Sequence, residues 1–272
     1  MQGFVRSTAA APVATLNRQG AGSVVLLCEH ASNYVPQGYD RLGLSAAELH
    51  SHIAWDIGAL ALAEQLSSLL DAPLVFATHS RLLLDLNRDV AAADSIVTES
   101  ADTAIPGNLL ITQTERRWRS DWLYAPFHAA VEMLIDERLS RGQATAVISI
   151  HSFTPEYLGQ TRPWHVGVLG RRDRRLADRI LESVRRDANL CVGDNQPYAP
   201  DQGVYHSIER HAERRGLPGA MIEVRNDLIS NSLGQTQWAG RLAHDFKWAL
   251  EAFESVVATG QRHTMVAEVA NK

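Results

Sequence analysis

Two histidines stand at the ends of strongly apolar segments. His151 lies near the end of Ala146–Phe153, a β-branched and almost uncharged run, and His30 comes shortly after the apolar run 23–28. Such runs are typical of strands buried on both faces of a sheet. Open α/β sheets bind their ligands at the carboxyl ends of strands. Both imidazoles are therefore candidate site residues, although a core histidine with one hydrogen-bond partner would give the same pattern.

Two glutamates lie beside or within apolar runs. Glu29 directly precedes His30, and Glu223 interrupts the buried run 220–225. A carboxylate inside such a strand is hard to explain as surface decoration. Either it pairs with a cation such as Arg225, or its surroundings tune it for chemistry.

A third pair of polar residues falls in a segment predicted to be helical. His52 and Asp56 are four residues apart, so on a helix they would share one face. A surface ion pair is the simplest interpretation. The apolar residues around Trp55 favour partial burial instead, which makes at least one of the two a candidate site residue.

Two arginines flank a very apolar stretch. Arg81 and Arg88 stand seven apart, with Asn87 beside the second. A buried guanidinium is costly unless it is paired. The partner is expected to be an internal carboxylate, for instance Asp85 or Asp89, or else a substrate.

Strands and helices alternate along the chain. The predicted strands are 23–28, 74–78, 146–153, 164–169, 190–192 and 220–225. Predicted helices lie between them and after the last one, so we expect a three-layer α/β/α sandwich with a mainly parallel, mixed sheet. The expected division is a flexible tail over 1–22, one domain over 23–258 and a C-terminal tail over 259–272. The long loops 91–110 and 193–203 are expected to shape a pocket.

Composition narrows the possible functions. The 272 residues carry a formal net charge of −5, which argues against an electrostatic nucleic-acid binder. No apolar run approaches the length of a membrane span, and no signal peptide is recognisable. Two cysteines without metal-binding spacing fit buried thiols in a reducing compartment, so a cytoplasmic location is expected.

The polar residues at the strand ends favour metal-dependent hydrolysis. Imidazoles and carboxylates without thiolates fit a catalytic zinc site that keeps an open position. A glutamate outside the metal shell would take a proton from water, and an arginine would bind an anion or an oxyanion. The sequence has no Gly-x-Ser-x-Gly elbow, Walker loop or dinucleotide fingerprint, which disfavours serine hydrolases and nucleotide chemistry.

Four short motifs together resemble those of a known family. They are Glu29-His30, Ser80-Arg81 with Asp85-Leu86-Asn87-Arg88, Ser149–Phe153, and Ile222-Glu223-Val224-Arg225. Their order resembles the N-formylglutamate amidohydrolases, and more distantly the zinc carboxypeptidases, over roughly residues 23–230. The resemblance implies the zinc carboxypeptidase-like fold and one zinc ion per chain.

The resemblance also implies roles for individual residues. His30 and His151 would bind the metal, and Glu223 would be the general base. Arg81 would serve the oxyanion or the substrate carboxylate. The substrate-binding residues implied by these motifs are Asn87, Arg88, Ser152 and Arg225.

The remaining metal ligand departs from both family patterns. Asn33 stands where a carboxypeptidase has its glutamate ligand, and the amidohydrolase Asp-x-Asp-Trp-His motif appears here as His52-Ile53-Ala54-Trp55-Asp56. We expect Asp56 to be the ligand and His52 to act outside the shell. The reverse assignment stays open, and Asn33 and Glu29 are further alternates.

The expected function is hydrolysis of a small, anionic N-acyl amino acid such as N-formylglutamate. A carboxypeptidase acting on a peptide and a metal-free, anion-binding relative without activity are the alternatives. No nucleic-acid or membrane partner is expected, and the sequence does not indicate an oligomeric state.

Overall fold

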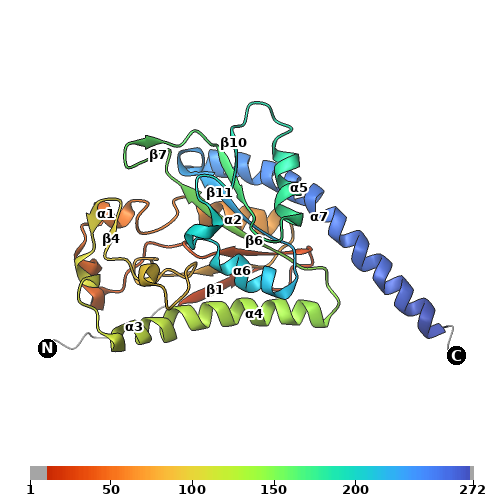
Figure 1. Ribbon diagram of the computed structural model, residues 1–272, viewed down its shortest axis with the longest axis horizontal. Helices are drawn as coiled ribbons and strands as arrows, with labels where there is room; N and C mark the ends of the chain where they lie inside the picture. Colours follow the sequence, from red (N-terminus) through yellow and green to blue (C-terminus); the bar gives the residue numbers. More distant parts are fainter. Residues whose placement is uncertain (1–10, 270–272) are drawn as a thin grey trace.

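A seven-stranded mixed sheet forms the centre of the protein (Figure 1). The computed structural model describes the backbone of residues 11–269 and the side chains of residues 11–253. The sheet consists of β1 (Val13–Leu16), β2 (Val24–Cys28), β3 (Leu74–Ala77), β6 (Ala146–Phe153), β9 (Val166–Leu169), β10 (Val192–Asp194) and β11 (Gly219–Arg225). The predicted central strands are confirmed to within two residues at most ends.

The order of the strands across the sheet is β1-β3-β2-β6-β11-β9-β10. The pairings of β3 with β2, β2 with β6, β6 with β11 and β9 with β10 are parallel. The pairings of β1 with β3 and of β11 with β9 are antiparallel. The mixed, mostly parallel sheet is therefore as expected, and three consecutive parallel strands, β2, β6 and β11, occupy its middle.

Helices cover both faces of the sheet. One face carries α2 (Ala59–Leu69), α5 (Arg175–Val184) and α7 (Ser232–Val269). The other carries α4 (Ala125–Ser140) and α6 (His206–His211), with α1 (Ala46–His50) and α3 (Gln113–Arg119) toward one end. The expected α/β/α sandwich is confirmed.

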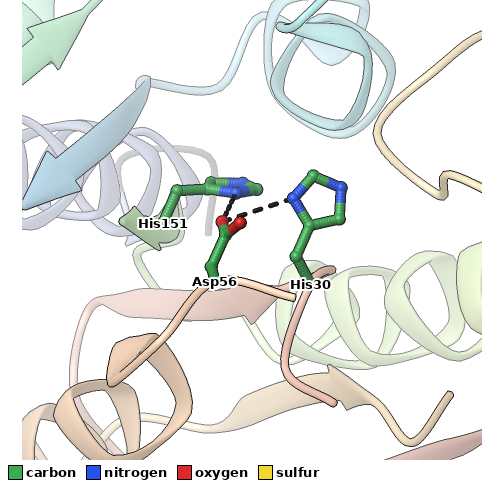
Figure 2. Close-up of side chains that lie close together, drawn as sticks. All are labelled: His30, Asp56 and His151. Atoms are coloured by element: carbon green, nitrogen blue, oxygen red, sulfur yellow. Dashed lines mark hydrogen bonds and ion pairs between the residues drawn. The ribbon is translucent and has the colours of Figure 1, made fainter. Parts of the chain in front are cut away.

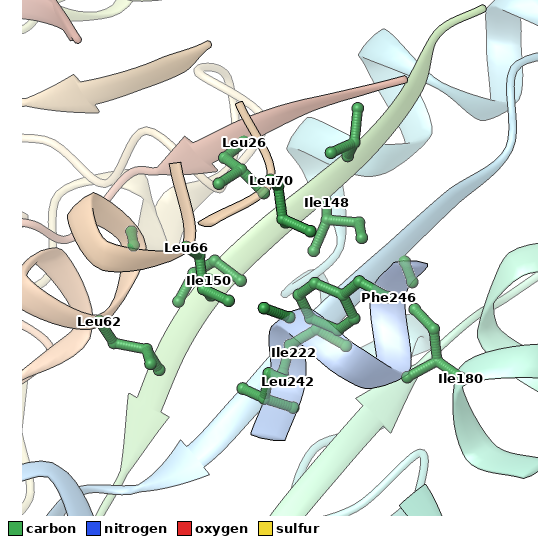
Figure 3. Close-up of a cluster of buried hydrophobic side chains, with 14 of the residues drawn as sticks. Leu26, Leu62, Leu66, Leu70, Ile148, Ile150, Ile180, Ile222, Leu242 and Phe246 are labelled. Carbon is green, nitrogen blue, oxygen red and sulfur yellow. The ribbon is translucent and has the colours of Figure 1, made fainter. Parts of the chain in front are cut away.

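Alternation along the strands produces two separate cores. In β2, Leu26 and Cys28 face α2 and α7, while Val25 and Leu27 face α4. Successive side chains of a strand point to opposite faces of the sheet. A strand without charged residues is therefore expected to be buried on both faces. Figure 3 shows the first core, in which Phe246 of α7 packs against the sheet near Ile222.

Three expectations about the chain are wrong. Residues 13–16 of the supposed N-terminal tail form β1 and pair with β3. The segment with His52 and Asp56, expected to be helical, is a turn, because α1 ends at His50 and α2 begins at Ala59. The last helix continues to Val269, so most of the supposed C-terminal tail is helical, while residues 270–272 lie outside the described part.

Gly58 explains why the helix is interrupted. It is the N-cap of α2 with φ +82°, a left-handed conformation that favours glycine. A Cβ at this position would lie 2.3 Å from the carbonyl oxygen of Ile229. The turn at 51–58 is therefore built around a position that accepts no side chain.

The described residues contain no helix long and apolar enough to cross a membrane. The two cysteines are free thiols. Cys28 is buried as expected, whereas Cys191 is exposed.

Replacing Phe246 should test the packing of α7 on the sheet. Phe246 is fully buried, so Phe246→Ala should lower the free energy of unfolding by about 3–5 kcal/mol. Urea unfolding followed by circular dichroism measures the change. Lys247→Ala is the matched control, since Lys247 is exposed on the same turn and should change stability by less than about 0.5 kcal/mol. Equal effects of the two variants would contradict the packing.

Two buried histidines link α4 to α6. His211 Nε2 lies 2.7 Å from His128 Nδ1, and His128 Nε2 donates to the carbonyl of Leu86 at 3.1 Å. Burial lowers the pKa of His211 to about 3 and that of His128 well below its usual value. Both imidazoles are therefore neutral in the folded protein near pH 7.

This pair should make the fold sensitive to acid. Below about pH 6.5 the unfolded chain takes up protons that the folded chain refuses until the pH approaches the folded pKa. The contribution of each neutral histidine to the free energy of unfolding is therefore fully present above pH 6.5. It falls as the pH drops, by up to about 1.4 kcal/mol per pH unit for each histidine. Urea midpoints between pH 7.5 and 5 should fall less steeply for His211→Asn than for the exposed-site control His244→Asn. Parallel slopes would refute this account.

Candidate metal and catalytic site

Three neighbouring strands bring their polar residues to one end of the sheet. His30 follows β2 after one residue, His151 lies in the last half of β6, and Glu223 lies in β11. The parallel register places Glu223 directly beside His151. The order β2-β6-β11 therefore assembles at one edge residues that are far apart in the sequence.

Asp56 reaches this edge from the turn between α1 and α2. Its backbone N–H donates to the carbonyl of His30 at 2.9 Å, which fixes the turn against the end of β2. Figure 2 shows its carboxylate between the two imidazoles. Asp56 Oδ2 lies 2.7 Å from His151 Nδ1 and 3.3 Å from His30 Nδ1.

Carboxylates also hold the outer nitrogens of both imidazoles. His30 Nε2 lies 2.7 Å from Asp85 Oδ1. His151 Nε2 lies 2.7 Å from Ser149 Oγ and 3.2 Å from Glu29 Oε2, and the Ser149 hydroxyl donates to Glu29 at 2.6 Å. Each ring thus turns its Nδ1 toward Asp56, and the contacts of its Nε2 hold it in that orientation.

The charges of this cluster depend on one another. Burial opposes ionisation of Glu29, but the hydrogen bonds from His151 and Ser149 outweigh it and lower its pKa to about 2. Burial likewise disfavours charge on Asp56 and His151, yet His30 and His151 lower the pKa of Asp56, and Asp56 and Glu29 raise that of His151. Because its pKa is raised, His151 can carry a proton that compensates part of the negative charge of Glu29 and Asp56.

The same atoms fit a metal ion. One ligand atom each from His30, Asp56 and His151 lie within 4.8 Å of one another, and all three residues are buried. Two imidazole nitrogens and one carboxylate oxygen with an open side form a donor set typical of catalytic zinc. Metal-binding histidines usually donate their other N–H to a carboxylate or carbonyl, which is the role of Asp85 and Glu29 here.

Glu223 is the one carboxylate of the cluster without a partner. Its Oε2 is buried and has no hydrogen bond among the described residues. Burial, with the nearby negative charge of Asp56, raises its pKa to about 8. The pKa of this carboxyl group is therefore near neutral pH, where a general acid–base catalyst can both accept and release a proton.

These groups line one cavity of about 420 Å³. The loop 91–110 and the loop 193–203 both contribute to its wall, as the sequence indicated. Cavities of roughly 300–1,000 Å³ are typical of small-molecule sites. His30, Asp56, His151 and Glu223 are all exposed to this space.

The two arginines also line the cavity, each with a carboxylate partner. Arg81 Nη2 lies 2.5 Å from Asp85 Oδ2 and Nη1 lies 3.5 Å from Asp56 Oδ1. Arg88 Nε pairs with the exposed Asp94 at 3.0 Å. The expected internal partner of Arg81 is therefore Asp85.

The remaining predicted substrate-binding residues differ in position. Asn87 lines the cavity, but its amide donates to the carbonyl of Val204 and its oxygen accepts from the N–H of Ser207. Ser152 also lines the cavity and donates to the carbonyl of Ile57. Arg225 does not reach the cavity, because it pairs with Asp227 at 2.8 Å.

The alternate metal ligands lie outside the His–Asp–His group. His52 lines the cavity and its buried Nε2 has no partner among the described residues. It does not share a helical face with Asp56, since both lie in the turn. Asn33 donates to the carbonyl of Leu49, and Glu29 supports His151 from behind.

Several cavity residues escaped the sequence interpretation. The sequence indicated Asp85 only as a partner for an arginine, because it lies four residues after Arg81. Its contact with His30 was not predicted. Tyr157 lines the cavity from the two-residue strand β7 (Glu156–Tyr157) and Tyr198 from an irregular loop, and neither segment is long enough to show a periodicity. Arg162 lies over both tyrosine rings, at 4.6 and 4.8 Å from their centroids.

Asp85 offers a test of the metal site from outside the ligand set. Asp85→Asn should weaken Zn²⁺ affinity by about 10–100-fold, because the carboxylate that orients His30 loses its charge. Competition with a fluorescent chelator measures the affinity. Asp89→Asn is the control, since Asp89 is exposed and four residues away. An unchanged affinity in Asp85→Asn would contradict the proposed orientation of His30.

Comparison with known proteins agrees with this geometry. The family model described as N-formylglutamate amidohydrolase matches residues 22–230. The crystal structure of gene product Atu2144 from Agrobacterium tumefaciens is 43% identical, with a TM-score of 0.89, over 92% of this chain and 99% of that chain. The crystal structure of N-formylglutamate amidohydrolase from Ralstonia eutropha JMP134 shares the fold at 19% identity and a TM-score of 0.61, over 90% of this chain and 99% of that one.

A search of curated proteins found no match. The family match extends from just before β2 to just after β11, so it includes the strands that carry His30, His151 and Glu223 as well as the turn with Asp56. The chain therefore belongs to the N-formylglutamate amidohydrolase family.

Proposed function

We propose that this protein is a zinc-dependent amidohydrolase that cleaves a small N-acyl amino acid with a free carboxylate. N-formylglutamate is the first candidate substrate, on the description of the family. The observation that carries the proposal is the buried, unpartnered Glu223 carboxyl group beside the His30–Asp56–His151 cluster in one cavity.

Zinc fits the donor set better than the common oxygen-preferring cations. Two imidazoles with one carboxylate suit Zn²⁺, whereas Mg²⁺ and Ca²⁺ prefer oxygen ligands. When bound, zinc would supply Lewis-acid chemistry that polarises the scissile carbonyl and acidifies the attacking water. The residues that would hold it are His30, Asp56 and His151.

Glu223 would move the protons of the reaction. Its carboxylate would accept a proton from the attacking water and return it to the leaving nitrogen as the C–N bond breaks. The products are a carboxylic acid, formate for an N-formyl substrate, and the free amino acid. The positive charge of a bound zinc ion would stabilise the ionised form of Glu223, which is the form that acts as base.

Arg88 is the better of the two arginines for the substrate carboxylate. Arg81 is held by the buried carboxylates of Asp85 and Asp56, so its charge is already compensated inside the protein. Among the described residues Arg88 pairs only with the exposed Asp94, which a bidentate substrate carboxylate could displace at lower cost. Asn87, bound to Val204 and Ser207, would then support the wall beside Arg88.

A panel of substrates would test the class of reaction. The zinc-loaded protein is incubated with N-formyl and N-acetyl amino acids and with dipeptides, and the free amine is measured. We expect turnover of N-formyl or N-acetyl amino acids above that of dipeptides. Preferential cleavage of dipeptides would favour a carboxypeptidase, and a protein that binds no zinc would overturn the proposal.

Glu223→Gln should separate catalysis from metal binding. Turnover should fall by about 10²–10⁴-fold because the amide cannot accept a proton. Zinc content, measured by atomic emission, should stay near that of the parent protein. Glu64→Gln is the matched control on the exposed face of α2 and should keep full activity. A Glu223→Gln protein with full turnover would exclude Glu223 as the base.

A further inference from the structure

The hydroxyl of Tyr198 lies on the cavity wall with its oxygen bound and its hydrogen free. Arg162 Nη1 donates to the Tyr198 oxygen at 3.0 Å. No acceptor for the Tyr198 O–H is found among the described residues, although the side chain lines the cavity. A hydroxyl that already accepts from a cation is set to donate its proton to a further group.

Arg162 is itself fixed by stacking. Its guanidinium lies 4.6 Å from the ring centroid of Tyr157 and 4.8 Å from that of Tyr198. It forms no ion pair with a carboxylate in the described part of the chain. The two rings therefore hold an uncompensated cation behind the Tyr198 oxygen, where it polarises the O–H bond.

Tyr198 lines the same cavity as Glu223 and Asp56. Burial raises its pKa to about 12, and the negative charges of Glu223 and Asp56 act in the same direction. Its hydroxyl thus keeps its proton at neutral pH. The group is a neutral donor in the cavity that also contains Glu223, the residue proposed as general base.

Two other polar side chains of this wall, those of Arg81 and Ser152, are less free to donate. Both Arg81 terminal nitrogens face the carboxylates of Asp85 and Asp56. The Ser152 hydroxyl is committed to the carbonyl of Ile57. The Tyr198 hydroxyl needs no partner exchange before it contacts a ligand.

We propose that Tyr198 donates its hydroxyl hydrogen to the scissile acyl oxygen as that oxygen gains negative charge, and that Arg162 positions Tyr198 for this contact. The inference rests on the proposed amidohydrolase function. It makes Tyr198 a catalytic residue and Arg162 a positioning residue. The hydrogen bond strengthens toward the transition state, so its loss lowers kcat more than it changes KM.

The test compares Tyr198→Phe, Arg162→Met and the double variant on the best N-acyl amino acid of the panel. Tyr198→Phe should lower kcat by about 10²–10³-fold, the usual effect of losing one such donor, with KM within about threefold of the parent. Zinc content should not change. Tyr34→Phe and Arg186→Met are the matched controls, since neither side chain lines the cavity.

The double variant separates positioning from other effects of Arg162. If Arg162 acts through Tyr198, Arg162→Met should lower kcat in the parent but change it little in the Tyr198→Phe background. If Arg162 instead acts on Glu223 or on the fold, its effect persists in that background, and the positioning role is overturned.

The remaining outcomes are also decisive. Full kcat in Tyr198→Phe, or a change confined to KM, would overturn the catalytic role while leaving the proposed function intact. No turnover of any N-acyl amino acid by the zinc-loaded parent protein would overturn the proposed function and, with it, this inference.

Discussion

The structure depends on one buried carboxylate, that of Asp56, held between two imidazoles. A buried charge is costly unless it is paired and hydrogen-bonded, and Asp56 satisfies both conditions through His30 and His151. Its position in turn requires the interrupted helix, because a continuous helix would not bring Asp56 to the end of β2. The bond from its own N–H to the carbonyl of His30 joins the turn to the strand. The sheet supplies the imidazoles, and the turn supplies the charge between them.

The surrounding acids fall into two groups with different chemistry. Glu29 and Asp85 are buried but paired, and their contacts lower their pKa values despite burial. Glu223 is buried and unpaired, and burial raises its pKa. Paired carboxylates orient other groups, whereas an unpaired one retains the capacity to exchange a proton near neutral pH. A similar contrast separates Arg81, compensated inside the protein, from Arg162, which contacts two aromatic rings and a phenol oxygen and forms no ion pair among the described residues.

Much of the site was visible in the sequence because strand ends are marked by composition. His151 and Glu223 interrupt strongly apolar runs that reveal buried strands, and parallel strands present their carboxyl ends at one edge. Asp56 was harder, because the sequence periodicity favoured a helix through the segment and left His52 nearly as good a ligand. Arg225 was expected to bind substrate from its motif, and the motif does not reveal that it pairs with Asp227 and is absent from the cavity lining. Tyr198 gave no signal at all, because it lies in an irregular loop.

The sequence by itself determined the alternation of strands and helices, the mixed and mainly parallel sheet, and which strands end in polar residues. These properties follow from the local composition and from the periodicity of apolar residues, and both can be measured along the sequence. Only the tertiary structure decided that Asp56 lies between the imidazoles, that Asp85 and Glu29 bind their outer nitrogens, and that Arg162 donates to the oxygen of Tyr198 at the cavity wall. Those choices depend on burial and on competition among partners distant in the sequence. Such competition is resolved only when the layers pack together.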